Sequence, residues 1–124
     1  GVAPEIMGYG PVPSTIKALS KAGLSISDIG LFEINEAFAI QVLSFLDHFG
    51  IADNDPRVNQ YGGAIAVGHP LASSGVRLMI NLARGFEEHP EVQYGLTTMC
   101  IGLGMGGSII WENPHFTGSG KAAK

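Results

Sequence analysis

Three polar residues of this chain have the side-chain chemistry to move protons, and each follows a segment predicted to be a strand. Cys100 is the only cysteine, and four glycines follow it within residues 102–107. His69 and Asn35 come after apolar runs that include residues 62–67 and 30–34. A thiol, an imidazole and an amide in one place can transfer a proton and stabilise an oxyanion. The three residues are therefore a candidate active site.

Each residue also has a purely structural explanation. Asn35 is a good helix N-cap, a lone histidine is often satisfied by backbone carbonyls, and a buried, inert cysteine is common. The other three histidines show no ligand spacing with His69 or Cys100, so no metal site is predicted. The position of all three candidates at one predicted sheet edge favours the active site over the structural explanations.

Hydrophobic periodicity predicts the elements that position these residues. Helices are expected at residues 14–22, 36–49 and 73–88, and strands at residues 30–34, 62–67, 94–100 and 108–112. Two alternations of strand and helix predict an α/β fold, with a layered sheet and flanking helices. Ligands of open α/β sheets bind beyond the carboxyl ends of the strands, where all three candidates fall.

The glycine-rich stretch after Cys100 is predicted to be a hairpin turn between two antiparallel strands. The spacing Gly102-x-Gly104-x-x-Gly107 is that of a dinucleotide-binding fingerprint. That fingerprint requires a helix after the glycines, and a strand is predicted here, so dinucleotide binding is not expected. The helices are expected to bury three sets of side chains: Ile16 and Leu19; Phe38, Val42, Phe45, Leu46 and Phe49; and Val76, Met79, Ile80, Ala83 and Phe86.

The composition limits the number of domains, the partners and the location that can be expected. The 124 residues fit one small domain, and the net charge of −4 does not favour a nucleic-acid partner. A single cysteine forms no internal disulfide and fits a reducing compartment. No apolar run approaches the ~20 residues of a membrane span, and no signal-like segment is present, so no membrane association and a cytoplasmic location are expected.

Four stretches resemble the C-terminal signatures of the thiolases, in that family's order and spacing. They are MGYGPVP (residues 7–13), NEAFA (35–39), GGAIAVGHPLASSGVR (62–77) and CIGLGMGG (100–107). The resemblance implies the C-terminal half of the thiolase fold. It also implies acyl transfer between 3-ketoacyl-CoA and CoA, giving acetyl-CoA and a shortened acyl-CoA, or the reverse Claisen condensation. Coenzyme A is then a substrate, and no permanently bound cofactor is expected.

The resemblance also implies residue roles. Cys100 matches the cysteine that transfers a proton at the acetyl α-carbon, and His69 the histidine that activates a nucleophilic thiol and donates to the thioester oxygen. Asn35 matches the residue that holds a water in the same oxyanion hole. Gly102 matches the glycine whose N–H binds the oxygen of the acyl-enzyme. Finally, the resemblance implies a pantetheine channel lined by Ala37 and Phe38.

One departure from the family is large, because the nucleophilic cysteine of thiolases belongs to an N-terminal domain and this chain has no second cysteine. The first strand of the C-terminal half, central in its sheet, is also expected to precede residue 1. We therefore expect residues 1–116 to form an incomplete thiolase C-terminal domain and residues 117–124 a disordered tail. Alone, the chain is expected to be inactive and to expose apolar surface, because the neighbours of the missing strand are left unpaired.

Other interpretations concern the same fold. A non-catalytic thiolase-like module for lipid binding or subunit scaffolding needs neither Cys100 nor His69, and both are present. A decarboxylating ketoacyl synthase of the same superfamily has a histidine or an asparagine where Cys100 stands. The expected partners are acyl-CoA and CoA, the missing N-terminal half and further copies in a homo-oligomer. A β-oxidation complex is a further candidate partner.

Overall fold

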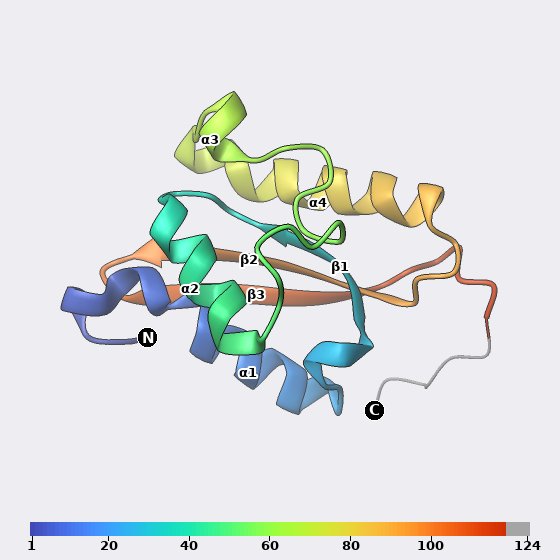
Figure 1. The fold of residues 1–124 in the computed structure, drawn as a ribbon, viewed down its shortest axis with the longest axis horizontal. Helices are drawn as coiled ribbons and strands as arrows, with labels where there is room; N and C mark the ends of the chain where they lie inside the picture. Colours follow the sequence, from blue (N-terminus) through green and yellow to red (C-terminus); the bar gives the residue numbers. More distant parts are fainter. Residues whose placement is uncertain (119–124) are drawn as a thin grey trace.

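The computed structural model describes residues 1–118, which form a mixed sheet with helices on both faces (Figure 1). The strands are β1 (Ile29–Ile34), β2 (Tyr94–Gly102) and β3 (Met105–Glu112), in the order β1-β2-β3. The helical segments are η1 (Pro4–Tyr9), α1 (Pro11–Ala22), η2 (Ile26–Asp28), α2 (Ala39–Phe49), α3 (Ala64–Val67) and α4 (Leu71–Glu88).

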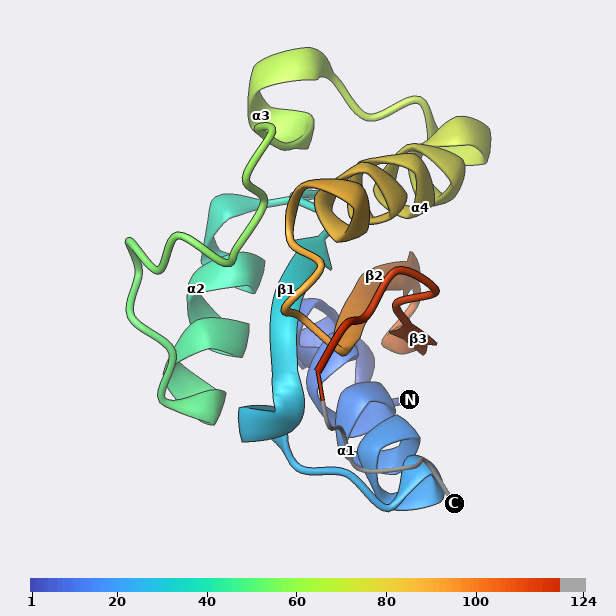
Figure 2. The same cartoon turned by 90° about the vertical axis from the view of Figure 1, so that its right-hand side faces the viewer.

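The layers follow from the alternation of side chains along β1. Phe32 and Ile34 point to the face covered by α1 and α2, where the main core lies. Leu31 points to the opposite face and packs against Leu82 and Phe86 of α4. Figure 2 shows α4 on one side of the strands and α1 with α2 on the other. The predicted α/β class, a layered mixed sheet with flanking helices, is confirmed.

Strands β1 and β2 pair directly and in parallel, from Ile29 opposite Tyr94 to Ile34 opposite Thr98. The expectation that sheet neighbours stay unpaired is therefore wrong for these two strands. Buried backbone N–H and C=O groups require partners, and direct pairing supplies them. The other edge of β1 is also used, because Phe32 N–H donates to the Arg57 carbonyl at 2.9 Å.

The predicted hairpin is confirmed, since β2 and β3 are antiparallel and Cys100 lies opposite Gly106. Gly102, Leu103 and Gly104 turn the chain with φ of 102°, 52° and 82°. Glycine adopts such positive φ without strain. A strand follows this turn, as predicted, so the glycine spacing does not form a dinucleotide fingerprint.

Residues 62–67 are not the predicted buried strand. They form a turn and the short helix α3, with Ile65 66% and Val67 63% exposed. A short apolar run does not distinguish a buried strand from other apolar segments. Here Gly62 and Gly68, with φ of 81° and 91°, bend the chain at both ends of the run.

The predicted helix starts are each a few residues off. Helix α1 begins at Pro11 rather than Ser14, and α2 at Ala39 rather than Glu36. Because α2 begins at Ala39, its N-cap is Phe38 and not Asn35. Helix α4 begins at Leu71 rather than at residue 73, so Ser74 lies inside the helix and is not its N-cap. The ends are predicted well, since Gly23 and Gly50 close α1 and α2 in the left-handed conformation.

The predicted buried faces are only partly right. Leu19, Phe45, Leu46 and Phe86 are buried, but Ile16 and Phe38 are 47% and 58% exposed. Helix α4 turns a different face to the sheet from the predicted one, and that face consists of Ser74, Leu78, Leu82, Gly85 and Phe86. The predicted inward residues Val76, Met79, Ile80 and Ala83 are exposed. Helix α4 therefore carries apolar side chains on both faces.

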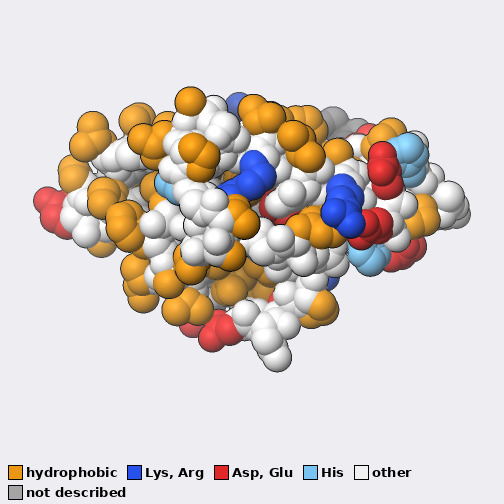
Figure 3. All heavy atoms as spheres, turned by 90° about the horizontal axis from the view of Figure 1, so that it is seen from above, with side chains coloured by type: hydrophobic (Ala, Val, Ile, Leu, Met, Phe, Trp, Pro, Cys, Tyr) orange, Lys and Arg blue, Asp and Glu red, His pale blue; other side chains and the backbone are white. Residues whose placement is uncertain are grey.

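Exposed apolar side chains are numerous, as predicted. Figure 3 looks onto the α3 and α4 side of the molecule and shows hydrophobic side chains spread across it. Those of α3 and α4 that are at least half exposed are Ile65, Val67, Leu71, Val76 and Ile80. Within residues 1–118, no helix is both long and apolar enough to cross a membrane.

The last described residues pack back onto the turn between α4 and β2. Thr117 N–H donates to the Pro90 carbonyl at 3.0 Å, and the Asn113 side chain donates to the Val92 carbonyl at 2.8 Å. Most of the segment predicted to be a disordered tail, residues 119–124, lies outside the described residues.

Candidate functional site

Asn35 follows β1 directly and is fully buried at the carboxyl end of the parallel pair. Its N–H donates to the Thr98 carbonyl of β2 at 2.9 Å, which fixes it two residues from Cys100 on the neighbouring strand. The backbone carbonyl of Asn35 accepts a hydrogen bond from Gln41 of α2 at 3.4 Å. The structure therefore places Asn35 and the end of β2 side by side, as the sequence predicts.

His69 reaches Asn35 from the loop between α3 and α4. Asn35 Nδ2 lies 3.3 Å from His69 Nε2, and His69 Nδ1 lies 2.6 Å from Ser74 Oγ. Ser74 is 1% exposed, and its hydroxyl lies 3.2 Å from the Pro70 carbonyl. The predicted pair of Asn35 and His69 is thus in contact, although His69 does not follow a strand.

The distances along this chain are compatible with a His69 tautomer that carries its proton on Nδ1. When the Ser74 hydroxyl donates to the Pro70 carbonyl, its oxygen accepts from His69 Nδ1–H. His69 Nε2 then carries a lone pair, which accepts from the Asn35 amide. A neutral imidazole with Nε2 unprotonated is a general base.

Ser74 is a member of the site that the sequence does not reveal. The pattern indicates only a helix-capping serine at residue 73 or 74. Because α4 begins earlier, Ser74 lies within its first turn, and its side chain points back to the histidine that precedes the helix. A hydroxyl five residues after a candidate histidine, at a helix start, was the available signal.

Two buried acceptors at the site have no hydrogen-bond partner within residues 1–118. They are Asn35 Oδ1 and Gln41 Oε1. A buried polar atom without a partner costs roughly 1–3 kcal/mol, so such atoms are uncommon away from functional sites. Their presence on Asn35 and on Gln41, which contacts Asn35, fits a site built to hold another polar group.

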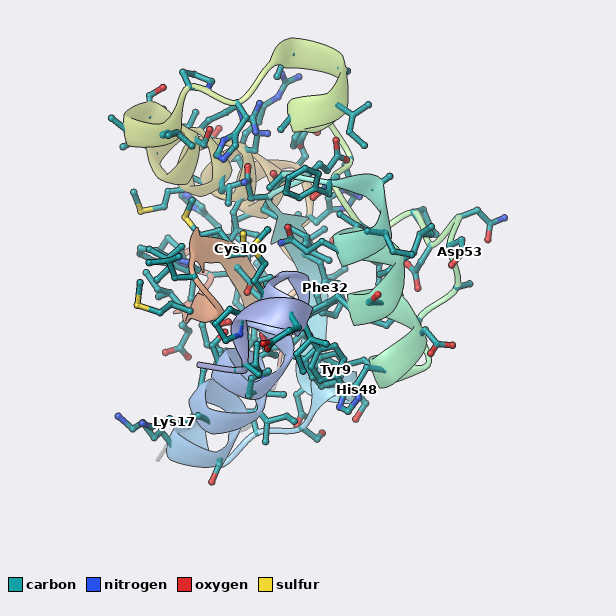
Figure 4. The ribbon with its side chains drawn as sticks, turned by 90° about the vertical axis from the view of Figure 1, so that its left-hand side faces the viewer. Tyr9, Lys17, Phe32, His48, Asp53 and Cys100 are labelled. Carbon is teal, nitrogen blue, oxygen red and sulfur yellow. The ribbon has the colours of Figure 1, made fainter. Side chains whose placement is uncertain are left out.

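Cys100 is partly exposed, with a free thiol, near the end of β2. Figure 4 shows it at the end of the strand that leads into the hairpin. Among the described residues no hydrogen bond joins Cys100 to Asn35 or His69. The backbone connects them instead, through Thr98. Gly102 follows on the hairpin turn, where a Cβ would meet no atom within 4 Å, so the space around its backbone is open.

An apolar groove of about 600 Å³ opens between η1 and the start of α2. It is lined by Glu5, Ile6, Met7, Gly8, Tyr9, Phe38, Ile40, Gln41 and Ser44. Phe38 is among the lining residues, whereas Ala37 is half-buried and not among them. The groove reaches Gln41, which contacts Asn35, so it leads towards the buried amide.

Glu33 is a charged group that sequence reasoning missed, and it lies 4% exposed on the α4 face of β1. Burial raises the pKa of Glu33 from 4.5 to about 7 and outweighs the opposing hydrogen bond from Asn81 and the charge of Arg77. Arg77 itself donates to the Gly68 carbonyl at 3.2 Å, next to His69. Glu33 and Arg77 therefore place a carboxyl group and a guanidinium near the loop that carries the histidine.

The raised pKa of Glu33 predicts that stability falls as pH rises. Below pH 4.5 the carboxyl is protonated in both states, and between pH 4.5 and about 7 only the folded state keeps the proton. The free energy of unfolding should drop by about 3 kcal/mol across this window. Denaturant unfolding of Glu33→Gln should show a flatter pH dependence than the unchanged chain. Glu87→Gln, an exposed control, should not, and parallel curves for Glu33→Gln would refute the argument.

Known proteins are similar to this chain over most of its length. A family model described as the C-terminal domain of thiolase matches residues 1–113. The chain is 56% identical over 113 residues to a 3-ketoacyl-CoA thiolase of Photobacterium profundum. It is 54% identical over 113 residues to a protein of the same name from Shigella dysenteriae serotype 1. Each match covers 90% of this chain and 29% of the relative. The chain therefore belongs to the thiolase family and corresponds to its C-terminal domain.

Proposed function

We propose that this chain supplies the C-terminal part of a thiolase site that transfers acyl groups between 3-ketoacyl-CoA and CoA. The products are acetyl-CoA and a shortened acyl-CoA, and the reverse direction is a Claisen condensation. The observation that carries the proposal is the ordered chain from Asn35 through His69 to Ser74, at the sheet edge where Cys100 lies. The family match over residues 1–113 supports it.

His69 is proposed to take the proton from a nucleophilic thiol. In its neutral form, with the proton on Nδ1 towards Ser74, His69 keeps a lone pair on Nε2 that can give up the Asn35 amide and accept the thiol proton. Once protonated, Nε2–H donates to the thioester oxygen, where negative charge develops. Asn35 Nδ2, 3.3 Å from Nε2, then contributes to the same oxyanion site, directly or through a water. Each such donor is worth roughly 10²–10³ in rate.

Cys100 is proposed to transfer the proton at the α-carbon. In thiolysis, a nucleophilic thiolate attacks the 3-keto carbon, and the carbon–carbon bond breaks. Its electron pair leaves as the enolate of acetyl-CoA. Cys100 donates its proton to that α-carbon and becomes a thiolate, which later receives the proton of the incoming CoA thiol. The partly exposed thiol beside an open glycine turn suits this role. Gly102 N–H is proposed to bind the oxygen of the acyl-enzyme.

The apolar groove beside α2 is proposed to hold the pantetheine arm or the acyl chain of the substrate. Phe38 lines it, and Ala37, the preceding residue, is proposed to contact the substrate beside it. Its volume of about 600 Å³ and mostly apolar lining suit an extended, weakly polar chain. Coenzyme A is a substrate in this proposal, and no permanently bound cofactor takes part.

The nucleophile has to come from outside this chain, which contains one cysteine. The chain spans 29% of the length of the relatives it matches, and the exposed apolar side chains of α3 and α4 provide surface for a partner. We therefore propose an N-terminal thiolase half as the partner. Homo-oligomerisation, a β-oxidation complex and a cytoplasmic location belong to the same proposal, the last because the free thiol suits a reducing compartment.

The proposal predicts that the chain is inactive by itself and active when it is joined to the rest of a thiolase. The purified chain should release no acetyl-CoA from acetoacetyl-CoA, because no nucleophile is present. A chimera in which it replaces the matching region of the Photobacterium profundum relative should cleave the substrate. Acetyl-CoA release by the chain alone, or a folded chimera without turnover, would overturn the proposal.

A second candidate is a non-catalytic lipid-binding or scaffold module, favoured by the size and apolarity of the groove. Such a module would hold a fatty acyl chain in the chimera without needing Cys100. Unchanged turnover in a Cys100→Ser chimera, with an acyl chain bound in the groove, would support it.

A further inference from the structure

Glu36 follows Asn35 directly, and its carboxylate joins three separate segments of the chain. We propose that Glu36 is a positioning residue that sets the distance between Asn35 and His69. The inference rests on the proposed function for the importance of that pair, but its test requires no turnover. Within residues 1–118, the hydrogen bonds of the Glu36 carboxylate go to Asn59 and Ile65 and not to His69, and Glu36 does not line the apolar groove.

The two carboxylate oxygens of Glu36 have different partners. Oε1 accepts from Asn59 Nδ2 at 2.9 Å, and Oε2 accepts from the Ile65 backbone N–H at 2.9 Å. Hydrogen bonds to a carboxylate are about twice as strong as those between neutral groups. A single side chain next to Asn35 therefore holds both the loop before α3 and the first turn of α3.

Asn59 anchors one side of this arrangement to β1. Its Oδ1 accepts from Ile34 N–H at 2.7 Å, and its Nδ2 donates to the Ile34 carbonyl at 3.0 Å. The amide thus pairs with β1 as another strand would. Asn59 has a φ of 47°, a conformation that asparagine adopts more readily than most residues. Through Asn59, Glu36 is fixed relative to the end of the strand that carries Asn35.

Gly63 lets the loop approach the carboxylate closely. A Cβ at this position would lie 2.0 Å from Glu36 Cδ and 2.2 Å from Oε1, so no larger residue fits without moving the carboxylate. The φ of Gly63 is −124°, which any residue adopts. The glycine is therefore needed for space and not for conformation, which makes Gly63→Ala a direct way to displace Glu36.

The loop from Gly63 to His69 is held at both ends. Glu36 binds Ile65 near its start, and Arg77 Nη1 donates to the Gly68 carbonyl at 3.2 Å at its end. The helix between them has four residues, too few to be stable in isolation. Releasing Glu36 should free the start of the loop, and the 3.3 Å contact between Asn35 Nδ2 and His69 Nε2 should weaken.

The test is NMR of the unmodified chain and of two variants, Glu36→Gln and Gly63→Ala. Glutamine keeps the shape but has one acceptor oxygen, so it cannot satisfy both donors. Both variants should increase amide exchange at Ile65 about 10- to 100-fold. Both should also reduce protection of the Asn35 side-chain amide and shift the 15N signals of the His69 ring towards a mixture of tautomers.

Matched controls separate positioning from general destabilisation. Glu87→Gln makes the same chemical change on the exposed face of α4, and Gly75→Ala places a Cβ 3.6 Å from Met99 Sδ, an ordinary contact. Both controls should leave the Asn35 and His69 signals unchanged. Unchanged His69 ring signals in folded Glu36→Gln or Gly63→Ala would overturn the inference.

The unmodified chain provides a test that needs no variant to fold. If Glu36 couples the loop to the pair, the Ile65 amide and the Asn35 side-chain amide should become unprotected in the same opening event. Matching opening free energies from denaturant-dependent exchange would support the inference. Opening of Ile65 while Asn35 stays fully protected would contradict it.

Discussion

Replacing Cys100 with serine in the chimera is expected to lower kcat for thiolysis about 10²–10⁴-fold. Serine is close to cysteine in size, and Cys100 is partly exposed, so the fold should be retained. A hydroxyl ionises far less readily than a thiol, so it is a poor carrier for the proton of an α-carbon. The measurement is the steady-state release of acetyl-CoA from a 3-ketoacyl-CoA, with KM determined separately.

Acyl exchange between acetyl-CoA and labelled CoA is the internal control for Cys100→Ser. This half-reaction forms and breaks only thioesters, so it needs the nucleophile and His69 but no proton transfer at carbon. It should remain within about threefold of the unmodified chimera, a change well below the factor expected for a lost acid. Equal losses in exchange and thiolysis would mean that Cys100 supports the fold or thioester binding and does not act at the α-carbon.

Replacing His69 with alanine is expected to impair both thiolysis and acyl exchange, each by about 10²–10⁴-fold. In the proposed mechanism, the variant removes the base for the thiol and one donor to the thioester oxygen. It also leaves the buried Asn35 amide and the Ser74 hydroxyl without their partner. Rates of both half-reactions, measured in the same chimera, distinguish this pattern from that of Cys100→Ser.

Two further variants show whether the effect of His69→Ala is specific to this histidine. Ser74→Ala removes only the group that holds the Nδ1 proton, so a smaller loss of about tenfold is expected. His115→Ala changes an exposed histidine after β3, and it should leave both half-reactions unchanged. If His69→Ala retained acyl exchange, His69 would not be the base.

The parts of the fold that the sequence predicts are those set by local chemistry. Glycine at positions 23 and 50 ends two helices because it adopts the left-handed conformation there. The hairpin after Cys100 follows from the glycines of the turn. The strand predicted at residues 62–67 fails because its apolar side chains suggested burial, whereas Ile65 and Val67 are exposed.

The buried face of α4 could not be predicted because the helix has two apolar stripes. Leu78 and Leu82 face the sheet, whereas Val76 and Ile80 face outward. Periodicity identifies apolar stripes but does not say which one meets the sheet. The outward stripe has the character of a contact surface, which agrees with a chain that spans 29% of its relatives.

The sequence identifies which residues belong to the candidate site, but it does not predict most of the contacts among them. Asn35 and His69 are identified from the sequence, and the structure brings them within 3.3 Å. Ser74 is missed because α4 begins earlier than predicted, although it follows His69 by only five residues. Glu36 is missed because its partners Asn59 and Ile65 lie on other segments. Such links depend on where loops meet in space, which spacing along the chain does not encode.

Deuterium incorporation into the methyl group of acetyl-CoA in D2O tests the central claim most directly, because it reports proton transfer at the α-carbon alone. The chimera with the unmodified chain should exchange these protons, and the Cys100→Ser chimera should lose the exchange while it still transfers acetyl groups to labelled CoA. Deuterium incorporation at the unmodified rate in Cys100→Ser would contradict the assignment of Cys100 as the residue that moves the proton.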